Sequence, residues 1–137
     1  FLISLIIDES TEKFFLTCPE VDTPDKTPIR DYVDVVDLNE AHLKALEYLI
    51  KNKKSEIINL GTGTGNSVLE VVNQVKKLTG VEIPIEKANT RQGDDAKKIA
   101  DIKKAKELLD WEPKRTIEDS VKSLLIWYKD HPNGWEK

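Results

Sequence analysis

Arginine is scarce in this sequence, and two of its copies stand beside an aspartate. The 137 residues include 21 lysines and arginines, of which three are arginine: Arg30, Arg91 and Arg115. Arg30 and Arg91 lie in loop or loop-to-strand segments, at residues 30–32 (Arg-Asp-Tyr) and 91–94 (Arg-Gln-Gly-Asp). A guanidinium can bind phosphate through two parallel hydrogen bonds, and an aspartate can accept sugar hydroxyls. The residues alone leave open whether each arginine binds phosphate or pins a loop through its aspartate; Arg115, just before a helix cap, favours a structural role.

A glycine-rich turn, Gly-Thr-Gly-Thr-Gly at residues 61–65, is the second feature that could bind phosphate. Backbone amides at a helix N-terminus attract anions, and a capping box at residues 67–70 predicts a helix directly after the turn. However, the spacing lacks the third glycine of the dinucleotide fingerprint, and no Gly-Lys-Ser/Thr completes a P-loop. The residues therefore favour a plain connection between a strand and a helix.

No group of residues predicts nucleophilic, acid-base or metal chemistry. Cys18 is the single cysteine and precedes a proline, so we expect an inert thiol. His42 lies beside the apolar stripe of a predicted helix, and His131 belongs to a terminal turn. One cysteine and two distant histidines do not make a four-ligand zinc site.

Composition narrows the function classes. The formal charge is −4, 39% of the residues are hydrophobic, and like charges do not gather in long blocks, which argues against nucleic acid and membrane surfaces as partners. The apolar run at residues 1–7 is too short to span a bilayer and lacks signal-peptide features, so we expect a buried strand or helix end and a cytoplasmic protein. The absence of methionine leads us to expect a fragment.

Hydrophobic spacing predicts an α/β fold with short strands and about four helices. The sequence predicts helices that begin after Asp37, Ser67, Asp101 and Thr116 as N-caps, the second of them ending at Gly80. It predicts strands at residues 32–36, 56–60 and 81–85. These make only a small sheet, so some of them are expected to join a sheet supplied by other residues.

Taken together, the motifs closely resemble the UDP-glucose 4-epimerase family of extended short-chain dehydrogenases. The resemblance runs from residue 16 onward, and it rests on residues 22–25, 29–33, 36–38, 59–63, 66–68, 91–94, 100–101, 109–111 and 131–134. Each motif is weak by itself, but the ordered set is specific.

The resemblance implies that residues 1–137 are the C-terminal, UDP-sugar-binding portion of an NAD(P)-binding Rossmann-like enzyme, without its N-terminal Rossmann portion. NAD would be bound by that N-terminal portion, and the parent enzyme could form a homodimer. UDP-glucose and UDP-galactose are the implied ligands. The implied substrate-binding residues are Arg30 and Arg91 on the diphosphate, Tyr32 and Val68 beside the uridine, Asp94 on the ribose, and Lys98 at the sugar end of the pocket.

The sequence departs from the family in ways that bear on activity. The family oxidises the sugar with a Tyr-x-x-x-Lys pair, and no tyrosine here stands four residues before a lysine; we therefore expect no catalytic residue and no activity in this chain alone. Asp34 stands where the family often has histidine, and Lys98 occupies a position that varies with sugar preference. A dehydratase or decarboxylase of another nucleotide sugar, and a non-catalytic module that binds nucleotide or a protein partner, are the alternatives.

Overall fold

The computed structural model describes residues 13–17, 20–89, 93, 95–132 and 134. The described residues form four helices and five short strands. In chain order they are β1 (Phe14–Leu16), β2 (Ile29–Arg30), α2 (Val35–Asn52), β3 (Asn66–Ser67), α3 (Val68–Thr79), β4 (Ile85–Lys87), β5 (Lys97–Lys98), α4 (Lys103–Leu109) and α5 (Ile117–Asp130). The predicted α/β class with about four helices is confirmed.

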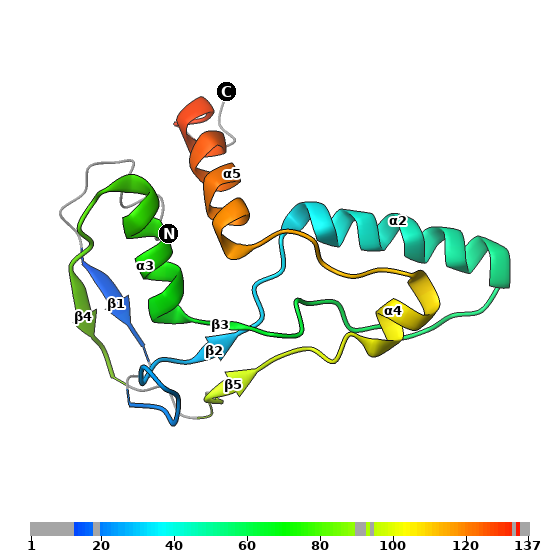
Figure 1. The fold of residues 1–137 in the computed structure, drawn as a ribbon, viewed down its shortest axis with the longest axis horizontal. Helices are drawn as coiled ribbons and strands as arrows, with labels where there is room; N and C mark the ends of the chain where they lie inside the picture. The colour runs from blue at the N-terminus through cyan, green and yellow to red at the C-terminus, as the bar shows by residue number, and fades with distance from the viewer. Residues whose placement is uncertain (1–12, 18–19, 90–92, 94, 133, 135–137) are drawn as a thin grey trace.

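The strands form two small sheets (Figure 1). In one sheet, β1 pairs with β4 in parallel. In the other, β2 lies in the centre, antiparallel to β3 on one side and parallel to β5 on the other. Residues more than sixty positions apart in the sequence are neighbours in this second sheet, which is where the candidate site lies.

Two hydrophobic clusters occupy the two ends of an elongated molecule (Figure 1). The first joins α3 and α5 and centres on Val72, Val75, Ile83 and Val121. The second joins α2 and α4 and centres on Ala41, Ala105, Leu109 and Trp111. The sheet of β3, β2 and β5 lies between them, and the chain runs from its strands into α2, α3 and α4.

The N-terminus of α2 differs from the prediction. The N-cap is Asp34, whose carboxylate accepts from the Val36 amide at 2.8 Å, and residues 32–36 form no strand because the helix has already begun at residue 35. Asp37, predicted as the cap, is instead buried and accepts from the amides of Lys114 and Arg115 at 3.0 and 2.9 Å. Its carboxylate therefore fastens the segment before α5 to α2.

Most of the other helix ends predicted from capping residues agree with the structure. Capping boxes begin α3 at Ser67 and α5 at Thr116, and Gly80 ends α3 in the left-handed conformation; all three are confirmed. The Asp101 side chain accepts from the Lys103 amide at 3.0 Å, but the residue that caps α4 is Ile102. The predicted strand at residues 81–85 is wrong except at its end, since β4 begins at Ile85.

Candidate functional site

The pairing of β2 with β5 sets two cations side by side. In this parallel pair Ile29 is opposite Lys97 and Arg30 is opposite Lys98. Residues opposite one another on adjacent strands project from the same face of the sheet. Arg30 and Lys98, which are 68 positions apart in the sequence (98 − 30), therefore lie next to each other on one face of the sheet.

Arg30 is oriented by the backbone around it. It is half-buried, and its Nη1 donates to the carbonyls of Ile29 and Asp95, both at 2.9 Å. Tyr32 lies close enough for the two groups to interact: burial raises the pKa of the Tyr32 hydroxyl, and the positive charge of Arg30 acts in the opposite direction. The phenol and the guanidinium thus share one region.

Lys98 is exposed, and its charge is partly balanced. Its Nζ lies 3.0 Å from the Asp95 carboxylate, and 61% of each of the two side chains is exposed. A surface ion pair of this kind contributes about 0 to 1 kcal/mol, so an anionic ligand can compete for the ammonium. Asp95, which the sequence did not single out, supplies a carbonyl to Arg30 and a carboxylate to Lys98.

Val68 completes the part of the candidate site that the structure describes. It is half-buried at the first position of α3, and its amide donates to the carbonyl of Pro28 at 3.0 Å. The preceding strand β3 places Asn66 opposite Arg30. Arg30, Tyr32, Val68 and Lys98 thus lie on or directly beside the sheet of β3, β2 and β5. Arg91 and Asp94, like Cys18 and residues 1–7, lie outside the described residues.

The backbone amides of the glycine-rich turn donate to acceptors within the chain. The amides of Thr62 and Gly63 donate to the carboxylate of Asp31 at 2.6 and 3.2 Å. The amides of Thr64 and Gly65 both lie 3.3 Å from the Thr62 hydroxyl oxygen. Because all four amides already have acceptors, the turn presents no set of donors for a phosphate. This geometry supports the plain connection that the spacing favoured.

The first amides of α3 are engaged in the same way. Their acceptors are the Glu70 carboxylate for Ser67, the Pro28 carbonyl for Val68, the Thr27 hydroxyl for Leu69 and the Ser67 hydroxyl for Glu70. The Asp25 carboxylate in turn accepts from the Thr27 amide at 2.9 Å and from the Ser67 hydroxyl. The loop at residues 22–28 therefore serves to close this helix end.

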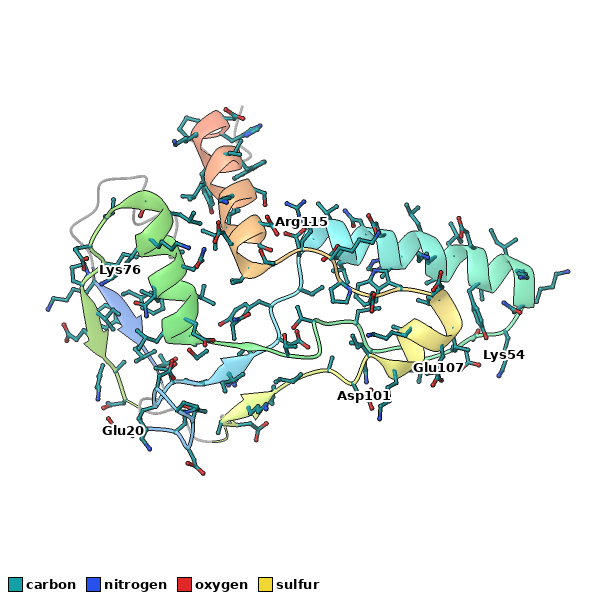
Figure 2. The ribbon with its side chains drawn as sticks, viewed as in Figure 1. Glu20, Lys54, Lys76, Asp101, Glu107 and Arg115 are labelled. Atoms are coloured by element: carbon teal, nitrogen blue, oxygen red, sulfur yellow. The ribbon has the colours of Figure 1, made fainter. Side chains whose placement is uncertain are left out.

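Arg115 has a structural role. Its Nε lies 3.0 Å from the buried carboxylate of Asp34, which also accepts from the Ser120 hydroxyl at 2.6 Å. Figure 2 shows Arg115 between the start of α2 and the start of α5. The pair links these two helices across the middle of the molecule. This agrees with the structural role expected for Arg115 from its position just before a helix cap.

The histidines belong to helix surfaces. Nδ1 of His42 lies 2.7 Å from the carbonyl of Leu38, and Nδ1 of His131 lies 3.0 Å from that of Trp127, on whose ring the imidazole stacks. Within the described ranges, no three His, Cys, Asp or Glu side chains gather as a metal site would require. None of the helices that the structure describes combines the length and apolar character needed to cross a membrane.

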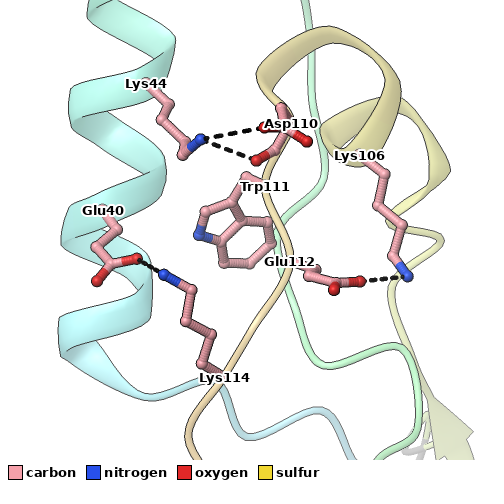
Figure 3. A pocket seen from close by; sticks show the side chains of 7 residues that line it. All are labelled: Glu40, Lys44, Lys106, Asp110, Trp111, Glu112 and Lys114. Carbon is pink, nitrogen blue, oxygen red and sulfur yellow. Dashed lines mark hydrogen bonds and ion pairs between the residues drawn. The ribbon is translucent and has the colours of Figure 1, made fainter.

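A separate hollow of about 460 Å³ lies between α2 and the segment after α4 (Figure 3). Trp111 stands behind it, with Nε1 donating to the carbonyl of Asp37 at 3.0 Å. Three ion pairs line it: Lys44 with Asp110, Lys106 with Glu112, and Lys114 with Glu40, at 4.0, 2.9 and 3.0 Å. Since its cations and anions are matched within the chain, this hollow has no net charge with which to recognise an ionic ligand.

Comparisons with known proteins identify the relatives of this chain. A family model described as GDP-mannose 4,6-dehydratase matches residues 18–124. The chain is 42% identical over 125 residues to the UDP-glucose 4-epimerase of Lactobacillus helveticus, a match that covers 90% of this chain and 38% of that protein.

Two solved structures show the same fold. A crystal structure of a UDP-glucose 4-epimerase superposes with a TM-score of 0.92 at 38% identity, over 99% of this chain and 41% of the other. A second, from Bifidobacterium longum in complex with NAD+ and UDP, gives a TM-score of 0.84 at 34% identity, over 97% and 39% of the two chains. The chain thus spans roughly two fifths of the proteins it resembles.

Proposed function

We propose, given that this chain belongs to the GDP-mannose 4,6-dehydratase family, that it is the UDP-sugar-binding portion of an NAD-dependent UDP-glucose 4-epimerase. The complete enzyme would interconvert UDP-glucose and UDP-galactose. The observation that carries this proposal is the register of β2 and β5, which sets Arg30 beside Lys98 on one face of the sheet. Similarity to UDP-glucose 4-epimerases over 90% of this chain supports the choice of ligand.

The geometry suits a nucleoside diphosphate. In the proposal, Arg30 and Arg91 bind the diphosphate, Tyr32 and Val68 border the uridine, Asp94 accepts ribose hydroxyls, and Lys98 reaches the sugar end. A guanidinium held by two carbonyls has already lost much of its rotational freedom, so less entropy is lost when phosphate binds. Charge-assisted hydrogen bonds then supply most of the affinity.

The described residues do not fit NAD. A dinucleotide pyrophosphate needs open amides at a glycine turn and helix N-terminus. Here the amides of residues 62–65 and of the start of α3 already have acceptors within the chain. The sequence also contains no Tyr-x-x-x-Lys. We therefore assign no step of hydride or proton transfer to this chain, and we propose that it has no epimerase activity by itself.

Calorimetric titration of the chain with UDP and with uridine tests the binding proposal. UDP should bind more tightly than uridine, and Arg30→Gln should weaken UDP binding by about ten- to a hundredfold, since a hydrogen bond to a charged group contributes about 1.5 to 3 kcal/mol. Lys51→Gln, which removes an exposed cation near the end of α2, is the matched control and should leave UDP affinity unchanged. Equal affinities for UDP and uridine, or equal effects of the two substitutions, would contradict the proposal.

A dehydratase of a guanosine nucleotide sugar is the second candidate, because the matching family model carries that description. Both candidates need the same diphosphate contacts and differ in the base. A parallel titration with GDP separates them: preference for UDP supports the epimerase, and preference for GDP supports the dehydratase.

A further inference from the structure

The sheet of β3, β2 and β5 arranges three polar side chains in a row across its strands. Asn66 of β3 is opposite Arg30 of β2, and Arg30 is in turn opposite Lys98 of β5. Adjacent strands lie about 4.8 Å apart, so the row extends over about 10 Å. It begins at a neutral amide, continues with a guanidinium and ends at an ammonium, so its positive charge lies on the side of β2 and β5.

A nucleotide sugar has its parts in a matching order. The nucleoside, the diphosphate and the sugar are joined in that sequence. In the proposed function, the uridine lies beside Val68, two residues after Asn66 and next to β3, and the diphosphate lies at Arg30 of β2. The remaining strand of the sheet is β5. A ligand laid across the three strands would therefore bring its sugar to Lys98.

Lys98 binds a carboxylate within the chain. Its Nζ lies 3.0 Å from a carboxylate oxygen of Asp95, three residues earlier. Because 61% of each side chain is exposed, water competes with both partners and the pair contributes little to stability. The carboxylate of Asp95 thus occupies a position next to the ammonium that an anionic group of a ligand can take over.

The two contacts of Asp95 are made by different parts of the residue. Its backbone carbonyl accepts from Nη1 of Arg30 at 2.9 Å, whereas its side chain pairs with Lys98. The side chain can rotate into solvent while the backbone stays in place. Asp95 can therefore release the ammonium to a ligand and keep its contact with the guanidinium.

The charge of the sugar decides whether this exchange is favourable. The hydroxyls of a neutral hexose offer no negative charge in place of the Asp95 carboxylate. A carboxylate on the sugar re-forms the same ion pair with the ligand, and charge-assisted hydrogen bonds are roughly twice as strong as those between neutral groups. The ammonium of Lys98 therefore favours an acidic sugar.

We propose that this site binds a nucleoside-diphosphate sugar whose sugar carries a carboxylate, a hexuronic acid, in preference to the neutral hexose. Lys98 binds the sugar carboxylate, and Asp95 gives up its place beside the ammonium. This assignment rests on the proposed function and adds to it a further class of ligand for the same site.

Calorimetric titration of the chain with UDP, UDP-glucose and UDP-glucuronate tests the assignment. The two nucleotide sugars differ only at C6, where a carboxylate replaces a hydroxymethyl group. We expect UDP-glucuronate to bind about fivefold more tightly than UDP-glucose, which is the upper range for an exposed ion pair. The preference should shrink in about 0.5 M sodium chloride, because salt screens exposed charges.

Matched substitutions identify the cation. Lys98→Gln should abolish the preference for UDP-glucuronate, and Lys98→Arg should retain it. Asp95→Asn, which keeps the backbone carbonyl and removes the competing carboxylate, should increase it. Lys97→Gln is the control, because it removes an exposed cation from the same strand at a position that faces the other side of the sheet; it should leave the preference unchanged.

The outcomes separate this assignment from the proposed function. Equal affinities for UDP-glucuronate and UDP-glucose, or equal effects of Lys98→Gln and Lys97→Gln on the preference, would overturn the assignment, while binding of UDP would leave the proposed function standing. If Lys98→Gln weakened UDP as much as UDP-glucuronate, the ammonium would contact the diphosphate, and the assignment would again be wrong. A chain that bound none of the three compounds would overturn both.

Discussion

The Asp31 carboxylate joins two segments that are distant in the sequence. It accepts from the amides of Thr62 and Gly63 in the glycine-rich turn and from the amide of Ala100 at 3.0 Å, just after β5. Burial raises the pKa of this carboxyl, but the hydrogen bonds outweigh burial and leave its pKa below the ordinary value. Asp31 therefore holds the backbone around Arg30 in place.

Replacement of Asp31 tests this positioning role. Asp31→Asn replaces one acceptor oxygen with an amide donor, so at least one backbone N–H is left without an acceptor. We expect the free energy of unfolding to fall by about 1 to 3 kcal/mol, measured by urea denaturation. Asp22→Asn, at an exposed loop position, is the control and should change it by less than about 0.5 kcal/mol. Equal stability of the two variants would show that Asp31 does not organise the turn.

Acid should destabilise the fold because it protonates carboxylates that, like Asp31, accept hydrogen bonds within the chain. Burial raises the pKa values of Asp25 and Asp34, but hydrogen bonds from Ser67 and Thr27 to Asp25, and from Ser120, Val36 and Arg115 to Asp34, leave both pKa values lowered. A carboxyl whose pKa is lower in the folded state stabilises it fully above the unfolded value, and this contribution is lost as pH falls through the folded value. Unfolding free energy should therefore decline below about pH 4, and the decline should be shallower in Asp34→Asn. An identical slope in the variant would contradict this assignment.

At the scale of elements, the glycine-rich turn depends on close packing at Gly61. A Cβ there would overlap the Asp31 carboxylate and lie 2.8 Å from the Ala100 Cβ. Gly80, by contrast, ends α3 with a φ of +71° and has nothing within 4 Å of the corresponding Cβ position. Gly61→Ala should thus destabilise through a clash, whereas Gly80→Ala should show only the cost of the left-handed conformation, about 1 to 2 kcal/mol.

Thermal unfolding of both glycine variants measures this difference. We expect the Tm of Gly61→Ala to fall further than that of Gly80→Ala. The added methyl group at Gly61 would clash with the Asp31 carboxylate and the Ala100 side chain and would push the turn away from them. A Tm for Gly61→Ala at or above that of Gly80→Ala would show that the turn can move aside without losing its contacts to Asp31.

Sequence patterns predicted those elements whose signals are local. The capping boxes at Ser67 and Thr116 and the C-terminal glycine of α3 each involve residues within one helical turn, so the chain itself specifies them. The cap of α2 was misplaced because two aspartates compete there, and the choice between Asp34 and Asp37 is made by Ser120, Arg115 and Lys114 far along the chain.

The candidate site, too, was predictable where the signal is local and not where it depends on strand pairing. Arg30 was recognisable from its residue type and its loop, but its position beside Lys98 follows from the pairing of β2 with β5, which no local pattern encodes. Asp95 was missed because it lies in a run of charged residues, Asp-Asp-Ala-Lys-Lys at residues 94–98, that is typical of a solvated surface. The signal that could have found it is the Arg30 side chain's need for an acceptor, which becomes visible only once the strands are paired.

At the scale of the whole molecule, the central sheet connects two separate hydrophobic clusters. The α3 and α5 cluster and the α2 and α4 cluster meet through the sheet of β3, β2 and β5 and through the Asp34–Arg115 pair. A ligand bound across β2 and β5 would contact the sheet from which the chain runs into α2, α3 and α4. Binding there should therefore stabilise the molecule as one unit rather than one end of it.

Residue-resolved NMR of the chain titrated with UDP shows directly whether the sheet of β3, β2 and β5 binds a nucleoside diphosphate, as we propose. We expect the amide signals of Arg30, Tyr32, Val68 and Lys98 to shift together and to saturate with one dissociation constant. The amides of residues 62–65, whose acceptors lie within the chain, should shift little. Shifts centred on the glycine-rich turn, or no saturable shift at the sheet of β3, β2 and β5, would contradict the claim.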